Sequence, residues 1–138
     1  MRATAILETV IYADDPAECA AFYVAVLGLV PVRAVPGRFS FLRCGAQMVL
    51  IFAPGPSSDA AQQGGIPAHG CHGAGHLCFA AQDAADLDAW VRHLTEKGVA
   101  IEHQQQWGAG RSIYFRDPAG NSVEVAERAI WGLGPDGG

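Results

Sequence analysis

Three side chains that could bind a cation or move a proton, Glu8, His76 and Glu124, lie in stretches that otherwise read as core β-strands. A charged group in an apolar strand is costly to bury unless it is paired or binds a cation. Two carboxylates and one imidazole form a hard donor set for a divalent cation, with positions left open for water or substrate. We therefore expect Glu8, His76 and Glu124 to be metal ligands, with Glu8 or Glu124 as the alternative general base.

The chain carries one pattern twice. Glu8 and His76 are 68 positions apart, and the same offset places Asp15 on Asp83 and Phe22 on Trp90. Each copy reads as a strand, a capped helix and three further strands. The repeat puts Glu8 and His76 at equivalent positions of the first strand of each copy, so two-fold pairing of the copies would bring them together.

Local signals predict both helices. Asp15 can cap the first helix, Pro16 suits its first position, and Gly28 ends it. Asp83 caps the second helix, which Gly98 ends. The apolar faces repeat at helical spacing and consist of Cys19, Phe22, Tyr23 and Val26 in the first helix and Leu87, Trp90, Val91 and Leu94 in the second.

The strands and boundaries follow from runs of apolar and β-branched residues between turn residues. The predicted strands are 5–13, 29–35, 39–43, 48–52, 75–81, 99–102, 111–116 and 121–126. We expect a single domain over 1–127, made of modules 5–53 and 75–127 joined by a linker at 54–74, with a C-terminal tail at 128–138. The loop of residues 53–75, rich in Gly, Pro and Ser, is either a tether or a mobile flap over a site.

The first copy offers no second carboxylate at the position of Glu124. Its counterpart is Val49 or Leu50, depending on how the turn is aligned, and neither can bind a metal. This favours three protein ligands and an open centre. Glu8 could instead pair with Arg111 or Arg33.

Segments in both halves of the chain carry a family likeness. They are Leu7–Val10, Phe22–Leu29, Gly75–Phe79 and Phe115–Glu124, with the spacings F-Y-x-x-x-L-G and D-P-x-G-N-x-x-E. Over nearly all of residues 5–127 the sequence resembles the vicinal oxygen chelate superfamily, which includes glyoxalase I, fosfomycin-resistance enzymes, extradiol dioxygenases and bleomycin-resistance proteins. The resemblance implies an α+β fold of two tandem βαβββ modules that form a cupped mixed sheet around a divalent metal. His76 and Glu124 match the family's ligands, whereas Glu8 stands where the family commonly has His.

Four further residues are candidates for substrate binding. If Arg116 pairs with Asn121 across the turn, Arg111 shares the face of Glu124 and could bind a carboxylate or phosphonate bidentately; a rim ion pair is the alternative. Trp107 and Tyr12 either wall the pocket or belong to the core. His69 could reach a substrate from the loop, or it could form a zinc site with Cys71, His72 and His76.

Two functions follow. The first is an enzyme that binds an oxygen-chelating small substrate at a divalent cation (Mn, Fe, Ni, Zn, Co or Mg), with glyoxalase or lyase, isomerase, epoxide-opening or dioxygenase chemistry. The alternative is a metal-free, ligand-sequestering protein of the bleomycin-resistance type. Metal stoichiometry discriminates between them.

Composition limits the partners. The formal net charge of −5 argues against nucleic acid and anionic membranes. The sequence has no run of 18 apolar residues and no apolar signal segment, so we expect a cytoplasmic protein whose four cysteines are reduced. Exposed sheet edges favour a homodimer.

Overall fold

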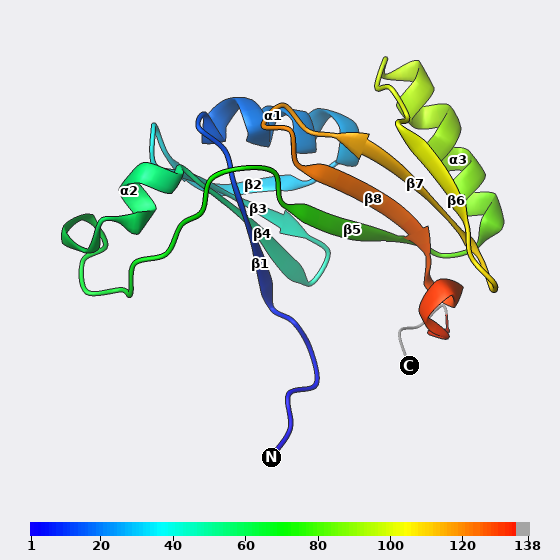
Figure 1. The fold of residues 1–138 in the computed structure, drawn as a ribbon, viewed down its shortest axis with the longest axis horizontal. Coiled ribbons are helices and arrows are strands. Elements are labelled where there is room, and N and C mark those ends of the chain that lie inside the picture. Colours follow the sequence, from blue (N-terminus) through cyan, green and yellow to red (C-terminus); the bar gives the residue numbers. More distant parts are fainter. Residues whose placement is uncertain (135–138) are drawn as a thin grey trace. The chain divides into compact units, whose positions relative to one another are not determined.

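The structure, a computed structural model, describes residues 1–134 (Figure 1). The chain forms two compact units. Unit 1 comprises Met1–Gly75 together with Asp117–Gly120, and unit 2 comprises His76–Arg116 and the residues from Asn121 onward. Each unit is described by itself.

Unit 1 contains a four-stranded mixed sheet with one long helix. Its strands are in the order β1-β4-β3-β2; β1 runs parallel to β4, and the other pairs are antiparallel. The elements are β1 (Glu8–Tyr12), α1 (Pro16–Leu27), β2 (Val30–Val35), β3 (Phe39–Cys44), β4 (Gln47–Phe52), α2 (Pro54–Ser58) and η1 (Ala60–Gln62).

Unit 2 repeats this plan. Its sheet has the order β5-β8-β7-β6, again with one parallel pair, β5 with β8. The elements are β5 (His76–Ala81), α3 (Ala84–Glu96), β6 (His103–Gln106), β7 (Arg111–Arg116), β8 (Ser122–Glu127) and η2 (Arg128–Trp131). The two identical strand orders confirm the predicted α+β fold of tandem βαβββ modules.

Both long helices begin where the sequence predicts. The Asp15 carboxylate accepts hydrogen bonds from the backbone N–H groups of Ala17 and Glu18, each at 3.1 Å. Asp83 accepts from the N–H of Asp86 at 2.9 Å. Gly28 ends α1 in the left-handed region with φ 69°, a conformation that a glycine adopts without a steric penalty.

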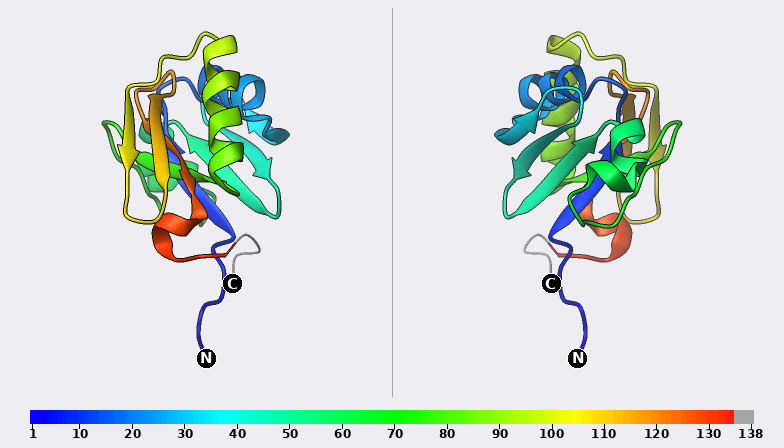
Figure 2. Two further views of the ribbon diagram at one scale, coloured as in Figure 1. Left: turned by 90° about the vertical axis from the view of Figure 1, so that its right-hand side faces the viewer. Right: turned by 90° about the vertical axis from the view of Figure 1, so that its left-hand side faces the viewer.

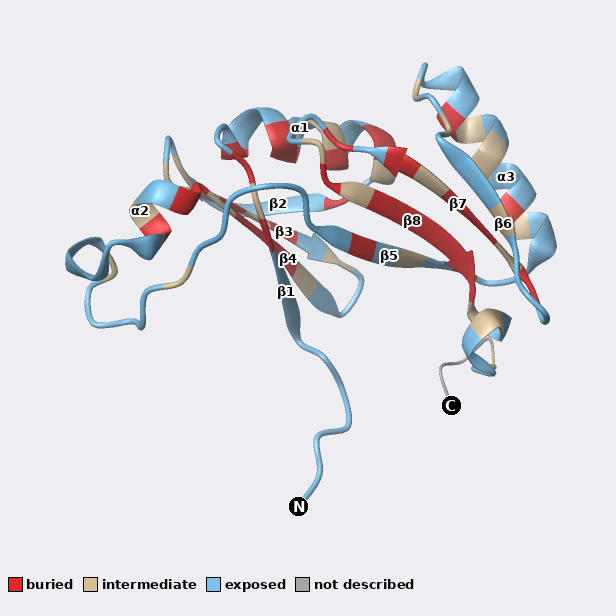
Figure 3. Ribbon diagram, in the orientation of Figure 1, coloured by how far each residue is buried: buried red, intermediate tan, exposed pale blue. Residues whose placement is uncertain are grey.

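One face of each sheet packs on the long helix of its unit, and the opposite face does not. In unit 1, α1 lies against the sheet and buries one face of β3 and β4 (Figures 1 and 3). In unit 2, α3 packs on one face of the sheet and contacts β5, β7 and β8 (Figure 2). The buried apolar residues on the helix side comprise Ile11, Leu42, Val49 and Ile51 in unit 1 and Leu77, Ile113, Phe115, Val123 and Val125 in unit 2. On β4 and β8, residues of the opposite face such as Leu50 and Glu124 are buried as well.

Residues 117–120 belong to unit 1 through buried polar contacts. The Tyr23 hydroxyl, on a fully buried ring, donates a 2.8 Å hydrogen bond to the Asp117 carboxylate. The Cys19 thiol donates to the same oxygen at 3.4 Å. Burial, followed by the Asp117 charge, raises the pKa of both groups strongly, so they remain protonated donors.

Three sequence predictions need correction. The strand expected at 99–102 lies at His103–Gln106, because β7 pairs with these polar residues and not with the apolar ones before them. The 53–75 loop contains α2 and η1. The first strand is not buried throughout, since a helix covers only one face of its sheet and Glu8 and Thr9 are exposed.

The tail predicted at 128–138 forms η2 at its start, and residues 135–138 lie outside the described part. Within residues 1–134, no helix has the length and apolar character needed to cross a membrane.

Candidate functional site

The open face of the unit 2 sheet brings together two of the predicted metal ligands. The His76 Nε2 atom lies 3.2 Å from a carboxylate oxygen of Glu124. The Glu124 side chain is 9 % exposed, whereas that of His76 is 50 % exposed. The pairing of β5 with β8 explains the contact, since Cys78 stands opposite Glu124 and His76 stands opposite Ser122 on the same face.

The second ring nitrogen of His76 also has a defined partner. His76 Nδ1 lies 3.0 Å from the backbone carbonyl oxygen of Ser122. A carbonyl oxygen only accepts, so in the neutral ring this contact places the proton on Nδ1 and leaves the lone pair on Nε2, beside Glu124. Histidines that bind metals commonly have this arrangement.

Hydrogen-bond donors surround the Glu124 carboxylate on the same sheet face. Tyr114, its neighbour on β7, and Cys78, its neighbour on β5, both donate to it. The Tyr114 hydroxyl in turn accepts from the Ser112 hydroxyl at 3.3 Å, and the Trp107 indole N–H donates to Ser112 at 2.9 Å. A chain of hydrogen bonds therefore runs from Trp107 to Glu124.

Burial and the nearby carboxylate keep these donors protonated. The Cys78 side chain is accessible, yet the surrounding protein desolvates its sulfur and, together with Glu124, raises the pKa of the thiol to about 12. Burial also raises the pKa of Tyr114; the hydrogen bond to Glu124 adds to the rise, and the bond from Ser112 opposes it. At neutral pH both groups present a proton to the carboxylate.

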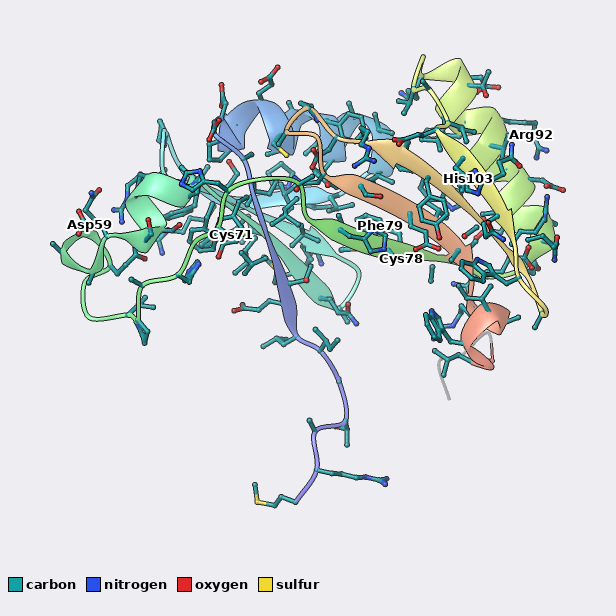
Figure 4. All side chains as sticks on the ribbon, viewed as in Figure 1. Asp59, Cys71, Cys78, Phe79, Arg92 and His103 are labelled. Carbon is teal, nitrogen blue, oxygen red and sulfur yellow. The ribbon has the colours of Figure 1, made fainter. Side chains whose placement is uncertain are left out.

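Two residues of this face, Tyr114 and His103, were not among the sequence-based candidates. His103 stands opposite Tyr114 on β6, with ring centroids 6.1 Å apart, and its Nε2 lies 3.0 Å from the Gln105 side-chain oxygen. The rings of His76 and Tyr114 are stacked with centroids 6.3 Å apart. Figure 4 marks His103 on β6 and Cys78 on β5. The strand register reveals both residues, and the sequence alone does not fix that register.

Glu8 is on the open face of the other unit. It stands opposite Met48 at the start of β1, followed on the same face by Val10 and Tyr12. No ion pair to Glu8 is present within the described residues of unit 1, so the predicted alternative pairing with Arg33 is not observed there. The counterpart of Glu124 is Leu50, which faces Val10 as Glu124 faces Cys78.

The donor set on unit 2 is compatible with part of a cation site. It supplies one imidazole nitrogen and one carboxylate, which are ligands for borderline and hard divalent ions. In residues 1–134, no group of three or more His, Cys, Asp or Glu side chains is arranged to hold a metal ion. A complete site would therefore need a further ligand brought to His76 and Glu124.

The strand register supposed for Arg116 is not observed, and the alternative given for Arg111, an ion pair, is the one found. Arg116 pairs with Ser122 and not with Asn121, and this difference of one residue places Tyr114, not Arg111, on the face of Glu124. Arg111 lies on the helix side of the sheet, where its Nη2 is 2.8 Å from Asp88 and its Nε is 3.4 Å from Glu127. The guanidinium is engaged in these ion pairs on the side away from Glu124.

The other three candidates for substrate binding, Trp107, Tyr12 and His69, lie in different units. Trp107 belongs to the hydrogen-bond chain of unit 2. Tyr12 and His69 meet in unit 1, where the Tyr12 hydroxyl lies 2.7 Å from His69 Nδ1. The alternative zinc site in the loop is not formed, because His69 lines one cavity of unit 1 whereas Cys71 and His72 line another.

The duplicated βαβββ units, each with an open sheet face, define a class of paired-module α+β proteins. Residues 5–125 match the Glyoxalase/Bleomycin resistance protein/Dioxygenase superfamily, and the chain belongs to this superfamily.

Three similar proteins illustrate the range of the family. A lactoylglutathione lyase structure from Agrobacterium tumefaciens is 45 % identical, with a TM-score of 0.93 over 96 % of this chain and 100 % of that one. An integron cassette protein from V. cholerae is 25 % identical, with a TM-score of 0.70 over 93 % of this chain and 98 % of that one. A catechol-2,3-dioxygenase from Bacillus subtilis (strain 168) is 25 % identical over 113 residues, 80 % of this chain; the chain spans only 38 % of that relative's length.

Proposed function

We propose that the chain is a metal-dependent enzyme that binds a small oxygen-chelating substrate. His76 and Glu124 would hold the divalent cation, and Glu8 would serve as third ligand or as general base. The observation that supports this most directly is the 3.2 Å approach of His76 Nε2 to the buried Glu124 carboxylate. When bound, a divalent cation would supply Lewis-acid polarisation of a substrate carbonyl or oxyanion.

The protein's own groups prepare the two ligands. The Ser122 carbonyl fixes the imidazole tautomer, and Tyr114 and Cys78 hold the Glu124 carboxylate by donating hydrogen bonds to it. A carboxylate held by such partners loses little freedom when it binds a cation or accepts a proton. The exposed imidazole of His76 gives solvent and substrate access to the pair.

Proton transfer at a carbonyl-bearing substrate is the reaction to test first. The Agrobacterium protein that is similar over its whole length carries the name lactoylglutathione lyase, and a carboxylate such as Glu8 or Glu124 can act as the base in lyase or isomerase chemistry. Leu50 offers no fourth ligand, which distinguishes this chain from a site with two carboxylates at the equivalent positions. Epoxide opening and dioxygenation would use the same three ligands.

The proposal also covers the oligomeric state and the cellular location of the protein. Exposed strand edges such as β2 and β6 favour a homodimer, and a cytoplasmic location fits four cysteines that form no disulfide among the described residues. Light scattering of the purified protein measures the oligomeric state directly.

The test is thermal unfolding of chelator-treated protein with Mn²⁺, Fe²⁺, Co²⁺, Ni²⁺, Zn²⁺ or Mg²⁺ added separately. A ligand that binds only the native state stabilises it by about 2.7 kcal/mol at a hundredfold excess over Kd. We expect at least one metal to raise Tm in the wild type but not in His76→Gln or Glu124→Gln. His72→Gln and Glu96→Gln are matched controls at exposed positions and should respond as the wild type does.

If no ion raises Tm, the metalloenzyme proposal fails. The metal-free, ligand-sequestering function of the bleomycin-resistance type then becomes the one to pursue. If a metal stabilises all variants equally, it binds elsewhere and the assignment of His76 and Glu124 is wrong.

A further inference from the structure

Unit 1 contains a cavity whose lining differs from that of the His76–Glu124 site in unit 2. Its volume is about 320 Å³, and its walls come from β2, β3, β4 and the segment that follows β4. A cavity of about 150 Å³ accommodates benzene, so this one has room for an aromatic ring and a short substituent. Its size is within the range of small-molecule sites.

Three phenylalanines on the open face of β3 and β4 form one wall. Phe39 and Phe41 are stacked with ring centroids 4.3 Å apart, and Phe52 meets Phe41 nearly edge-on at 5.4 Å. His69, from the loop, meets Phe52 edge-on at 4.7 Å. Flat apolar surfaces in both stacked and edge-on orientations suit an aromatic guest.

The charged residues that line the cavity are both positive. They are Arg33 and Arg38, and no Asp or Glu belongs to the lining, although the chain as a whole has a formal net charge of −5. The Arg33 guanidinium carbon lies 5.7 Å from the centre of the Phe39 ring. Neither arginine forms an ion pair with a carboxylate of the described residues.

Arg38 also has an unsatisfied donor. Its Nη2 donates a 2.5 Å hydrogen bond to the Gln62 carbonyl, which holds the guanidinium against the cavity wall. Its Nε is buried and has no hydrogen-bond partner. Such a group is rare in folded proteins and costs free energy, so an acceptor that reaches it contributes more than an acceptor for an already hydrated donor.

We propose that this cavity binds a small aromatic carboxylate. The ring of the ligand packs against Phe41 and Phe52, and its carboxylate accepts a hydrogen bond from Arg38 Nε and is attracted by Arg33. A guanidinium recognises a carboxylate through charge-assisted hydrogen bonds, which a neutral analogue cannot replace. The site uses neither His76 nor Glu124, so it does not depend on the proposed metal chemistry.

The experiment is calorimetric titration of full-length, chelator-treated protein with phenylacetate and 1-naphthoate. Benzyl alcohol supplies the ring without the charge, and acetate supplies the charge without the ring. The variants are Arg38→Gln, Arg33→Gln and Phe41→Leu. Arg43→Gln is the matched control, because Arg43 lies outside this cavity, on β3 with Phe39 and Phe41, and its loss changes the net charge equally.

We expect the aromatic acids to bind and both the alcohol and acetate to bind at least about tenfold more weakly. The alcohol loses the charge-assisted hydrogen bond, and acetate loses the packing of the ring against the phenylalanines. Arg38→Gln should weaken phenylacetate binding by a similar factor, while Arg43→Gln leaves it unchanged. In ¹H–¹⁵N spectra, the Nε–H resonance of Arg38 should shift on titration. Arg33→Gln, at an exposed position, tests the charge without disturbing the fold.

Three results would overturn the proposal. One is equal binding of phenylacetate to wild type, Arg33→Gln and Arg38→Gln. Another is equal binding of acetate and phenylacetate, which would identify a simple anion site. The third is a shift of the His76 and Tyr114 resonances in place of those of Arg38, Phe41 and Phe52. Because no metal is present, none of these results depends on whether His76 and Glu124 bind a cation.

Discussion

His76 and Glu124 come from neighbouring parallel strands, and their side chains meet at 3.2 Å on the sheet face that no helix covers. The Glu124 carboxylate is buried, whereas the His76 imidazole is open to solvent. His76 and Cys78 are the exposed neighbours of Glu124 on this face. The groups behind Glu124 therefore decide how well the pair is held.

Replacing Tyr114 by Phe should loosen Glu124. The change removes a hydroxyl that joins Ser112 to the carboxylate, and we expect the free energy of unfolding to fall by about 1 to 2 kcal/mol. If the proposed metal site is correct, metal affinity should also fall about tenfold or more, as for other groups that support a ligand. Urea unfolding and metal titration measure the two effects.

Tyr12→Phe is the control for Tyr114→Phe. It also removes a hydroxyl from an open sheet face, the one that contacts His69, but in unit 1. It should affect stability without affecting metal affinity. An equal loss of metal affinity in both variants would contradict a positioning role for Tyr114.

Stability should fall as the pH rises above about 9. The pKa values of Cys19 and Tyr23 are raised in the folded protein above 9.0 and 10.0, their ordinary values, because both are buried beside Asp117. In alkaline solution the unfolded chain loses these protons while the native state keeps them, so each pH unit costs up to about 1.4 kcal/mol per group. Urea unfolding from pH 8 to pH 11 measures the slope.

Tyr23→Phe should reduce that slope above pH 10 by up to one proton, although the variant is less stable at neutral pH because Asp117 loses a donor. A slope unchanged in Tyr23→Phe would show that other groups cause the alkaline loss.

Leu50→Ala should affect folding and not metal binding. Leu50 is 8 % exposed and occupies the position in unit 1 that Glu124 has in unit 2. Removing a buried leucine costs about 2 to 5 kcal/mol. The chelator-treated and metal-loaded forms should lose the same amount, whereas Glu124→Gln should remove the metal-induced rise in Tm. A selective loss of metal binding in Leu50→Ala would contradict this assignment.

Arg111→Gln should lower Tm more at low salt than at 1 M salt. Its guanidinium pairs with Asp88 and Glu127 on the helix side of the sheet. The exposed pair with Asp88 is screened at 1 M salt, where the Debye length is about 3 Å, whereas the pair with the buried Glu127 is screened less. Substrate or phenylacetate binding should be unchanged. Arg92→Gln, on the exposed side of α3 (Figure 4), is the control for the change in charge. A specific loss of binding in Arg111→Gln would restore the original assignment.

Local signals predicted more of this molecule than long-range ones. Asp15, Pro16 and Gly28 set the ends of α1 because capping depends on neighbours in the sequence. The internal repeat predicted two equivalent units, and the alternation of side chains placed Glu124 with Ser122 on one face. The contact of Glu124 with His76 depends on the parallel pairing of β5 with β8, which the sequence did not specify.

The sequence could not fix which residue of β7 faces Glu124. Arg116 could pair with Asn121 or with Ser122, and a slip of one residue exchanges the two faces of the strand. With the observed register, Tyr114 and not Arg111 lies on the face of Glu124. The strand β6 was displaced for a related reason, since His103–Gln106 are polar and only their pairing with β7 makes them a strand.

The shared register of the two sheets gives each module a different tolerance to mutation. Leu50 in the unit 1 sheet and Glu124 in the unit 2 sheet occupy equivalent register positions, as do Phe52 and Ala126. The strand order and register are thus present twice, whereas the His76–Glu124 pair is present only in unit 2. Exchanging equivalent residues between the sheets would therefore separate what the backbone register contributes from what each side chain contributes.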